Sequence, residues 1–108
     1  MTSAAAAIVD KLLEDNLVVV FSKTYCPYCA KAKNVFHQYG GALKSYKVIE
    51  LDEREDGDAI QEYLGKITPS RAVPRVFVGG KFIGGGDDTV ALYNKGELKE
   101  QLRIAGAL

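Results

Sequence analysis

The 108-residue sequence contains no tryptophan, three prolines, one histidine and only two cysteines. Two cysteines are too few for a disulfide framework, and Cys26 and Cys29 stand too close together for a disulfide between them to staple a long loop. An excess of one charge is also missing, because 14 Lys and Arg residues balance 14 Asp and Glu residues. Since no segment carries a basic cluster, the sequence gives no indication of a nucleic-acid partner.

Long hydrophobic runs are absent as well. The longest, residues 4–9 and 17–21, are far shorter than the ~20 residues that a transmembrane helix needs, so no membrane span is predicted. The first residues show no basic stretch followed by an apolar segment and a small-residue cleavage site. No secretory signal is therefore visible, and we expect a cytoplasmic location.

The composition is that of a globular domain, with 47% hydrophobic and 26% charged residues. A chain of about 100 residues is long enough to bury one hydrophobic core without disulfides or metals. No linker, internal repeat or low-complexity tract divides the sequence. We therefore expect a single domain over residues 1–108.

Helices and strands alternate along most of the chain. Hydrophobic residues at helical spacing predict five helices: one from Ala4 until Asn16 closes it, then 27–39, 59–64, 89–94 and 97–104. Runs of β-branched and aromatic residues predict four strands, over residues 17–21, 46–51, 76–78 and 81–83. The last two strands form a hairpin around Gly79-Gly80, and the continuously apolar first strand should be central. This order predicts the α/β class, with a small mixed sheet and helices on both faces.

The strongest chemical signal is Cys26-Pro27-Tyr28-Cys29 at the start of the second predicted helix. The free N–H groups and positive dipole end of a helix N-terminus favour thiolate over thiol, so Cys26 is the expected nucleophile. Cys29 lies one turn further along the same face and is the expected resolving thiol. Half of a zinc site and two incidental buried thiols are the alternatives. Zinc needs four ligands, whereas the chain offers these two cysteines and His37.

Three segments together resemble a dithiol glutaredoxin. They are Lys23-Thr24-Tyr25-Cys26-Pro27-Tyr28-Cys29, Arg71-Ala72-Val73-Pro74 and Gly84-Gly85-Gly86-Asp87-Asp88. A thioredoxin usually has Trp-Cys-Gly-Pro-Cys instead. The resemblance implies a thioredoxin fold, in which a central four-stranded mixed sheet is flanked by about five helices. It also implies that Pro74 is a cis-proline facing the cysteines at the start of the third strand.

The resemblance further implies a glutathione site around Cys26. Lys23, Gln61 and Arg71 match family positions that reach the glycyl carboxylate, although each is alternatively an ordinary surface residue. The backbone of Val73 would pair with the cysteinyl unit of the tripeptide in the manner of a short added strand. We also expect Tyr28 to shape the groove.

The last part of the implied site is the start of the fourth predicted helix. Gly85 and Gly86 would allow close backbone approach, and the helix N-terminus would offer amides to the γ-glutamyl carboxylate. Asp87 or Asp88 could meet the ligand ammonium, while the alternative for both aspartates is capping of the helix that starts at Thr89.

Two positions depart from the family pattern. Ala72 stands where threonine is usual before Val-Pro, which removes a hydroxyl group but leaves the backbone contact expected of Val73. Gly86 stands where many members carry a further cysteine, so a third thiol is missing.

The resemblance implies an oxidoreductase that uses glutathione as reducing co-substrate and holds no tightly bound cofactor or metal. Its partners would be glutathionylated or disulfide-containing proteins and, indirectly, glutathione reductase with NADPH. We expect a monomer. The alternative is a dimeric iron–sulfur cluster carrier, in which Cys26 and an external glutathione thiol from each subunit ligate the cluster. Such carriers in the family more often have Cys-Gly-Phe-Ser.

Overall fold

The computed structural model describes residues 3–108. The α-helices are α1 (Ala4–Asp15), α2 (Pro27–His37), α3 (Gly57–Ile67), α4 (Gly86–Asn94) and α5 (Glu97–Ala105). The strands are β1 (Val18–Ser22), β2 (Tyr46–Glu50), β3 (Arg75–Val78) and β4 (Lys81–Gly84). Two short 3-10 helices, η1 (Gly40–Ala42) and η2 (Leu51–Glu53), flank β2.

The four strands form one mixed sheet in the order β2-β1-β3-β4. Strand β1 runs parallel to β2 and antiparallel to β3, and the β3–β4 pair is antiparallel. All five residues of β1 are buried, which confirms the prediction of a central first strand. Because β1 and β2 are parallel, their carboxyl ends lie at the same edge, where Ser22 is paired with Glu50.

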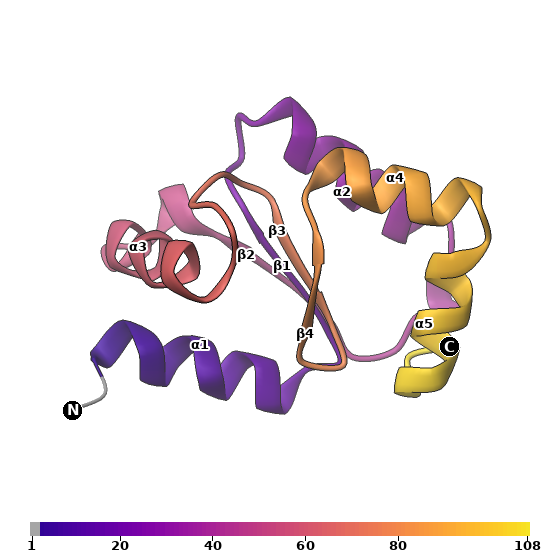
Figure 1. Ribbon diagram of the computed structural model, residues 1–108, viewed down its shortest axis with the longest axis horizontal. Helices are drawn as coiled ribbons and strands as arrows, with labels where there is room; N and C mark the ends of the chain where they lie inside the picture. The colour runs from indigo at the N-terminus through magenta and orange to yellow at the C-terminus, as the bar shows by residue number, and fades with distance from the viewer. Residues whose placement is uncertain (1–2) are drawn as a thin grey trace.

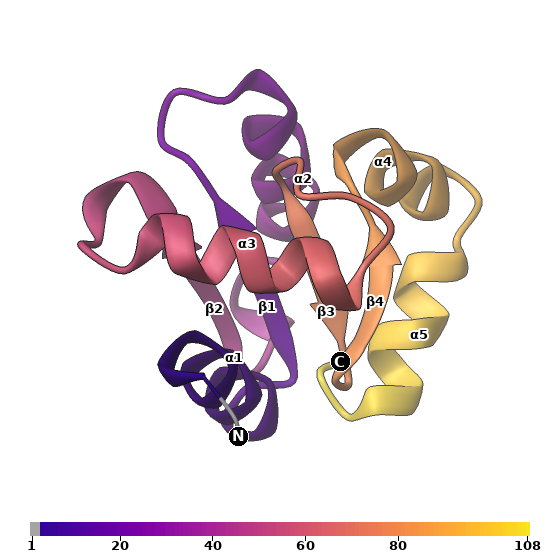
Figure 2. The ribbon, with the colours of Figure 1, turned by 60° about the vertical axis from the view of Figure 1, so that its left-hand side comes forward.

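Helices cover both faces of the sheet (Figures 1 and 2). Side chains alternate along β1, so Val18 and Val20 pack with α2 and α5, whereas Val19 and Phe21 pack with α1 and α3. Full burial of an aliphatic or aromatic side chain stabilises a fold by about 1.5–3 kcal/mol. The two hydrophobic layers thus fix β1, and with it the loop that leads from β1 into α2.

The structure corrects the predicted bounds of several elements. Helix α3 begins at Gly57 rather than at residue 59 and ends at Ile67 rather than at residue 64. Helix α4 begins at Gly86 rather than at Thr89. Asp58 in α3 and Asp87 and Asp88 in α4 therefore belong to the first turn, where carboxylates are favoured by the helix dipole. The predicted end of α2 moves from Tyr39 to His37, and the ends of the strands shift by about one residue.

One consequence concerns the predicted capping of α4. Asp87 and Asp88 lie inside the first turn, and Gly85 is the N-cap residue. Asp88 still satisfies a free backbone donor, because its Oδ2 accepts a hydrogen bond of 3.0 Å from the Gly85 N–H. The prediction that the aspartates precede the helix is therefore wrong, while a capping contact from one of them exists.

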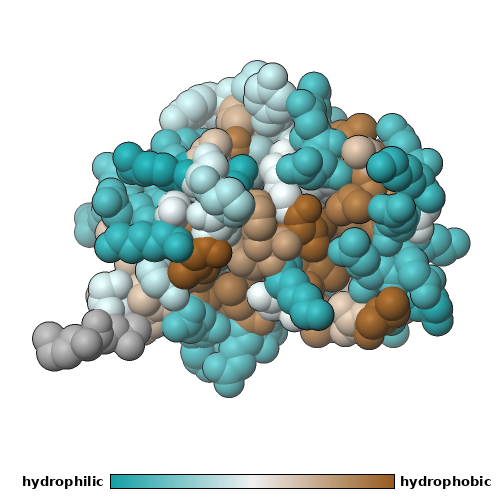
Figure 3. Space-filling model, in the orientation of Figure 1, coloured by the Kyte–Doolittle hydropathy of each residue, from teal (hydrophilic) through white to brown (hydrophobic). Residues whose placement is uncertain are grey.

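The surface is mixed in character. Hydrophilic residues dominate the outline of the view in Figure 3, and hydrophobic residues gather near its centre and right side. None of the helices that the structure describes is both long and apolar enough to cross a membrane.

Candidate active site at the N-terminus of α2

Cys26 is the N-cap residue of α2. Its backbone is extended, Pro27 occupies the first helical turn, and the Cys26 Sγ accepts a hydrogen bond of 3.4 Å from the Cys29 N–H. The sulfur therefore takes the place that a Ser or Asp oxygen takes in an ordinary helix cap. Cys26 is partly exposed, so the same sulfur is open to a reactant. The prediction that the cysteine pair opens a helix is confirmed.

Cys29 stands in different surroundings, because it is fully buried. Burial raises the pKa of the Cys29 thiol to about 11, and the contact with Cys26 acts in the same direction. Hydrogen bonds from the Lys23 backbone N–H, at 3.4 Å, and from Ser22 partly oppose that rise in pKa. Neither cysteine is in a disulfide. At neutral pH the Cys29 sulfur is therefore held as a thiol.

The segment before β3 lies beside the Cys26 sulfur and forms one side of the candidate site. The Val73–Pro74 bond is cis, as the family resemblance implies. The Cys26 thiol donates to the Val73 carbonyl across 3.8 Å, which places Val73 directly beside the sulfur. Arg75, which is not among the predicted site residues, is buried behind this segment and donates from Nε to the Pro74 carbonyl at 3.0 Å. Its guanidinium also lies 4.9 Å from the centre of the Phe82 ring.

Gln61 and Arg71 are brought together, but each has a protein partner. The Gln61 Nε2 donates a hydrogen bond of 2.7 Å to the Arg71 carbonyl, so α3 holds the loop that carries Arg71. The exposed Arg71 guanidinium lies 3.8 Å from the carboxylate of Glu62. Lys23 is partly buried, and within residues 3–108 its ammonium group has no hydrogen bond or ion pair.

The start of α4 packs tightly against the cysteine turn. A Cβ atom at Gly86 would lie 2.5 Å from the Tyr28 carbonyl oxygen, so a larger residue there would force the backbone to shift. The absence of a third cysteine thus coincides with close contact between α4 and α2. Gly85 is less confined, since a Cβ there would lie 3.3 Å from the Arg75 guanidinium.

Tyr28 and Asp87 share one neighbour. The Lys31 ammonium lies 5.0 Å from the centre of the Tyr28 ring and 3.5 Å from the Asp87 carboxylate. Tyr28 is 51% exposed and Tyr25 is 71% exposed, so two aromatic rings flank Cys26 at the surface. His37 is exposed at the opposite end of α2, away from both sulfurs.

Asp52 also belongs to this end of the molecule, although it is not among the predicted residues. It follows β2, and its carboxylate accepts hydrogen bonds from both the N–H and the hydroxyl group of Thr24. These bonds lower the pKa of the Asp52 carboxyl group. The pairing of parallel strands is the signal that could have indicated it, because the loops after β1 and β2 meet at one edge.

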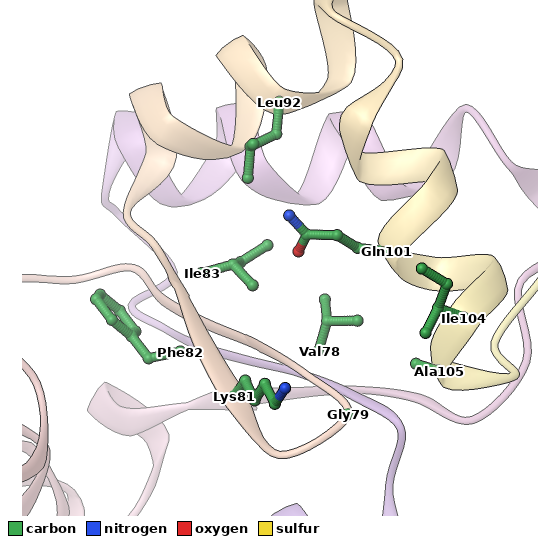
Figure 4. A pocket seen from close by; sticks show the side chains of 9 residues that line it. All are labelled: Val78, Gly79, Lys81, Phe82, Ile83, Leu92, Gln101, Ile104 and Ala105. Atoms are coloured by element: carbon green, nitrogen blue, oxygen red, sulfur yellow. The ribbon is translucent and has the colours of Figure 1, made fainter.

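A separate cavity of about 610 Å³ lies between β4 and the last two helices (Figure 4). Its lining is mostly aliphatic, with Lys81 and Gln101 as its polar residues, and it includes neither cysteine. Among residues 3–108, no group of three or more His, Cys, Asp or Glu side chains is placed to hold a metal ion. The reactive groups thus gather at the N-terminus of α2.

Comparisons with known proteins agree with this arrangement. The sequence model of the family described as Glutaredoxin matches residues 18–83. The chain is 49% identical over 105 residues to Glutaredoxin-C4 of Arabidopsis thaliana, covering 97% of this chain and 76% of the relative. It is 50% identical over 98 residues to a glutaredoxin of Ricinus communis, covering 91% and 93%.

Solved structures show the same fold. Oxidized glutaredoxin 2 from Chlamydomonas reinhardtii superposes with a TM-score of 0.85 at 48% identity, covering 98% of this chain and 100% of that one. A buckwheat glutaredoxin–glutathione complex superposes with a TM-score of 0.88 at 45% identity, covering 96% and 92%. These matches confirm the predicted α/β thioredoxin fold.

Proposed function

Because this chain belongs to the glutaredoxin family of thiol-disulfide oxidoreductases, we propose that it reduces protein–glutathione mixed disulfides through Cys26 alone and protein disulfides through Cys26 and Cys29 together. The observation that carries the proposal is the contrast between the two sulfurs. Cys26 is a partly exposed N-cap whose sulfur accepts a backbone hydrogen bond, whereas Cys29 is buried. Hydrogen bonds to a sulfur stabilise its thiolate, which is the attacking species in disulfide exchange.

In the first route, the Cys26 thiolate attacks the glutathione sulfur of the mixed disulfide. A bond forms between Cys26 and glutathione, the old S–S bond breaks, and the client sulfur leaves as a thiolate that takes a proton from solvent. The thiolate of a second glutathione then attacks the bound glutathione sulfur. This step forms glutathione disulfide and regenerates the Cys26 thiolate. The glutathione disulfide joins the glutathione removed from the client to one free glutathione, which is the reductant of this route.

In the second route, Cys26 attacks a client disulfide and remains joined to one client sulfur. Cys29 then attacks Cys26, which releases the reduced client and leaves a Cys26–Cys29 disulfide for glutathione to reduce. The order of events follows from the surroundings of Cys29. A Cys26 sulfur in a mixed disulfide carries no negative charge, so the part of the raised pKa of Cys29 that comes from Cys26 disappears.

Glutathione would lie beside Cys26, along the segment before β3 and the start of α4. Support comes from the buckwheat relative, whose structure contains glutathione. Lys23, Gln61 and Arg71 supply donors at one end, and the Val73 backbone lies beside the sulfur. At the other end, the amides offered to the γ-glutamyl carboxylate are those of the first turn of α4, which begins at Gly86.

Ligand binding at these ends requires an exchange of partners. The Asp87 carboxylate is paired with Lys31, so a ligand ammonium would compete with Lys31 for it. Asp88 caps α4 through the Gly85 N–H. We therefore assign the ammonium contact to Asp87 and the capping contact to Asp88.

The remaining predictions concern partners and place. Glutathionylated and disulfide-containing proteins would be the clients, and glutathione reductase with NADPH would restore glutathione. The monomeric state and the cytoplasmic location expected from the sequence stay predictions. The iron–sulfur carrier hypothesis differs in one visible property. Anaerobic purification would give a coloured dimer whose absorbance disappears on oxidation, whereas our proposal expects a colourless monomer.

A turnover assay tests the proposal. The reaction would contain a small glutathione mixed disulfide, glutathione, glutathione reductase and NADPH, and NADPH consumption would be followed. We expect consumption that depends on the protein and is lost in Cys26→Ser. A rate equal to that without protein would contradict the proposed function.

A further inference from the structure

Thr24, two residues before Cys26, is held from another part of the chain. The Asp52 Oδ1 accepts a hydrogen bond of 3.0 Å from the Thr24 N–H, and the Asp52 Oδ2 accepts a second from the Thr24 hydroxyl group. One carboxylate thus binds the backbone and the side chain of a single residue. Hydrogen bonds to a charged acceptor are stronger than those between neutral groups.

The support of Asp52 is rigid. Its neighbour Leu51 is 2% exposed and packs in the core between the sheet and α3. A Cβ atom at Gly57 would lie 1.9 Å from the Leu51 carbonyl oxygen, so α3 is seated directly on η2. Asp52 itself is exposed, and its carboxylate projects from this fixed 3-10 turn. The core thus holds the backbone from which Asp52 reaches Thr24.

The segment that Asp52 holds connects both cysteines to β1. The Cys26 N–H donates to the Lys23 carbonyl at 3.2 Å, which closes a turn around Thr24. The Lys23 N–H donates to the Cys29 sulfur at 3.4 Å. A movement of Thr24 would thus displace the residue that carries the nucleophile and the backbone donor to the resolving thiol.

We propose that Asp52 is a positioning residue of the reaction, which holds the Lys23–Cys26 turn through Thr24 so that the Cys26 sulfur stays in its N-cap place on α2. The proposal rests on the proposed function, because it assigns Asp52 a part in the same site. Asp52 is not a catalytic residue, since it acts through Thr24 and does not contact the sulfur.

Asp52 can act on Cys26 through its negative charge or through its hydrogen bonds to Thr24. The two effects predict opposite shifts in the pH at which Cys26 reacts when Asp52 is removed. An anion near the site disfavours a thiolate, so removal of its charge alone should lower the pH at which Cys26 reacts. Loss of the two hydrogen bonds to Thr24 should instead weaken the hydrogen bond from the Cys29 N–H to the Cys26 sulfur and raise that pH. The direction of the change therefore distinguishes the two effects.

The experiment compares Asp52→Ala, Thr24→Val and the double variant in the full chain. Thr24→Val removes the hydroxyl donor at constant charge. Thr24→Ser keeps the hydroxyl group and should match the unaltered protein in every readout. Glu53→Gln is the matched control, because Glu53 is exposed in the same 3-10 turn and makes no hydrogen bond or ion pair within the described residues. The readouts are the pH midpoint of Cys26 alkylation, kcat and KM in the turnover assay, and Tm.

We expect Asp52→Ala, which loses both hydrogen bonds to Thr24, to raise the alkylation midpoint and to lower kcat/KM by about tenfold or more. The double variant should lose little more than Asp52→Ala alone, because the hydroxyl bond that Thr24→Val removes is one of the two bonds that Asp52→Ala removes. An unchanged or lowered midpoint in Asp52→Ala, or a lowered Tm with unchanged kinetics, would overturn the inference. Absence of turnover in the unaltered protein would instead refute the proposed function.

Discussion

The two cysteines at the first turn of α2 lie in different surroundings, although only two residues separate Cys26 from Cys29. At one end, Cys26 is partly exposed, and its sulfur accepts a hydrogen bond from the Cys29 N–H. At the other end, Cys29 is fully buried, and burial raises the pKa of its thiol to about 11. The difference shows that the fold around the motif, and not the two cysteines alone, divides attack from resolution.

The largest expected effect comes from removal of either sulfur. Cys26→Ser should abolish both reactions, because a serine hydroxyl is not ionised at neutral pH and cannot replace the nucleophile. Cys29→Ser should keep reduction of glutathione mixed disulfides and lose most reduction of protein disulfides, since only the latter needs a resolving thiol. The two activities would be measured side by side for each variant. Equal loss of mixed-disulfide reduction in both variants would refute this division of labour.

A smaller effect is expected at Ser22, the buried last residue of β1. Its hydrogen bond partly offsets the raised pKa of Cys29, so Ser22→Ala should raise that pKa further. The lost bond corresponds to about 0.5–1.5 kcal/mol, and protein-disulfide reduction should slow accordingly. Mixed-disulfide reduction by the same preparation is the internal control and should not change. A parallel loss of both activities would show that Ser22 does not act on Cys29 alone.

The smallest effect is expected at Lys23, three residues before Cys26. Lys23→Gln should raise the pH midpoint of Cys26 alkylation and weaken binding of glutathionylated substrate by about 0.2–1 kcal/mol, the contribution of a partly exposed ion pair. Kinetics at several salt concentrations would check it, because salt weakens such a pair in the unaltered protein. If neither the alkylation midpoint nor the kinetics changed, the glycyl carboxylate of glutathione would have to be bound by Gln61, Arg71 or backbone amides instead.

Much of this site was predictable because its signals are local. The Cys26-Pro27 pair, which follows a β-branched run after a short loop, predicts a helix that begins at the cysteines, and α2 begins there. The apolar run that forms β1 predicts a central strand for the same reason. The position of a functional thiol at a helix N-terminus thus followed from neighbours in sequence.

The contacts that adjust the site were not predictable in this way, because they join distant segments. Asp52 meets Thr24 across 28 residues, and that contact depends on the pairing of β1 with β2. Arg75 lies just before the predicted strand 76–78, and no local signal indicates that its guanidinium donates to the Pro74 carbonyl. The start of α4 was misplaced because carboxylates suit both a position before a helix and its first turn.

The most direct test of the contrast between the two sulfurs is the location of a single alkylation. The reduced, unaltered protein would react at pH 7 with less than one equivalent of iodoacetamide, and fragmentation of peptide 24–31 would locate the label. The structure predicts that the label lies on Cys26 and that Cys29 reacts only near pH 11 or in the denatured chain, where both cysteines should react alike. A label found on Cys29, or shared equally between the two cysteines in the folded protein, would contradict the account.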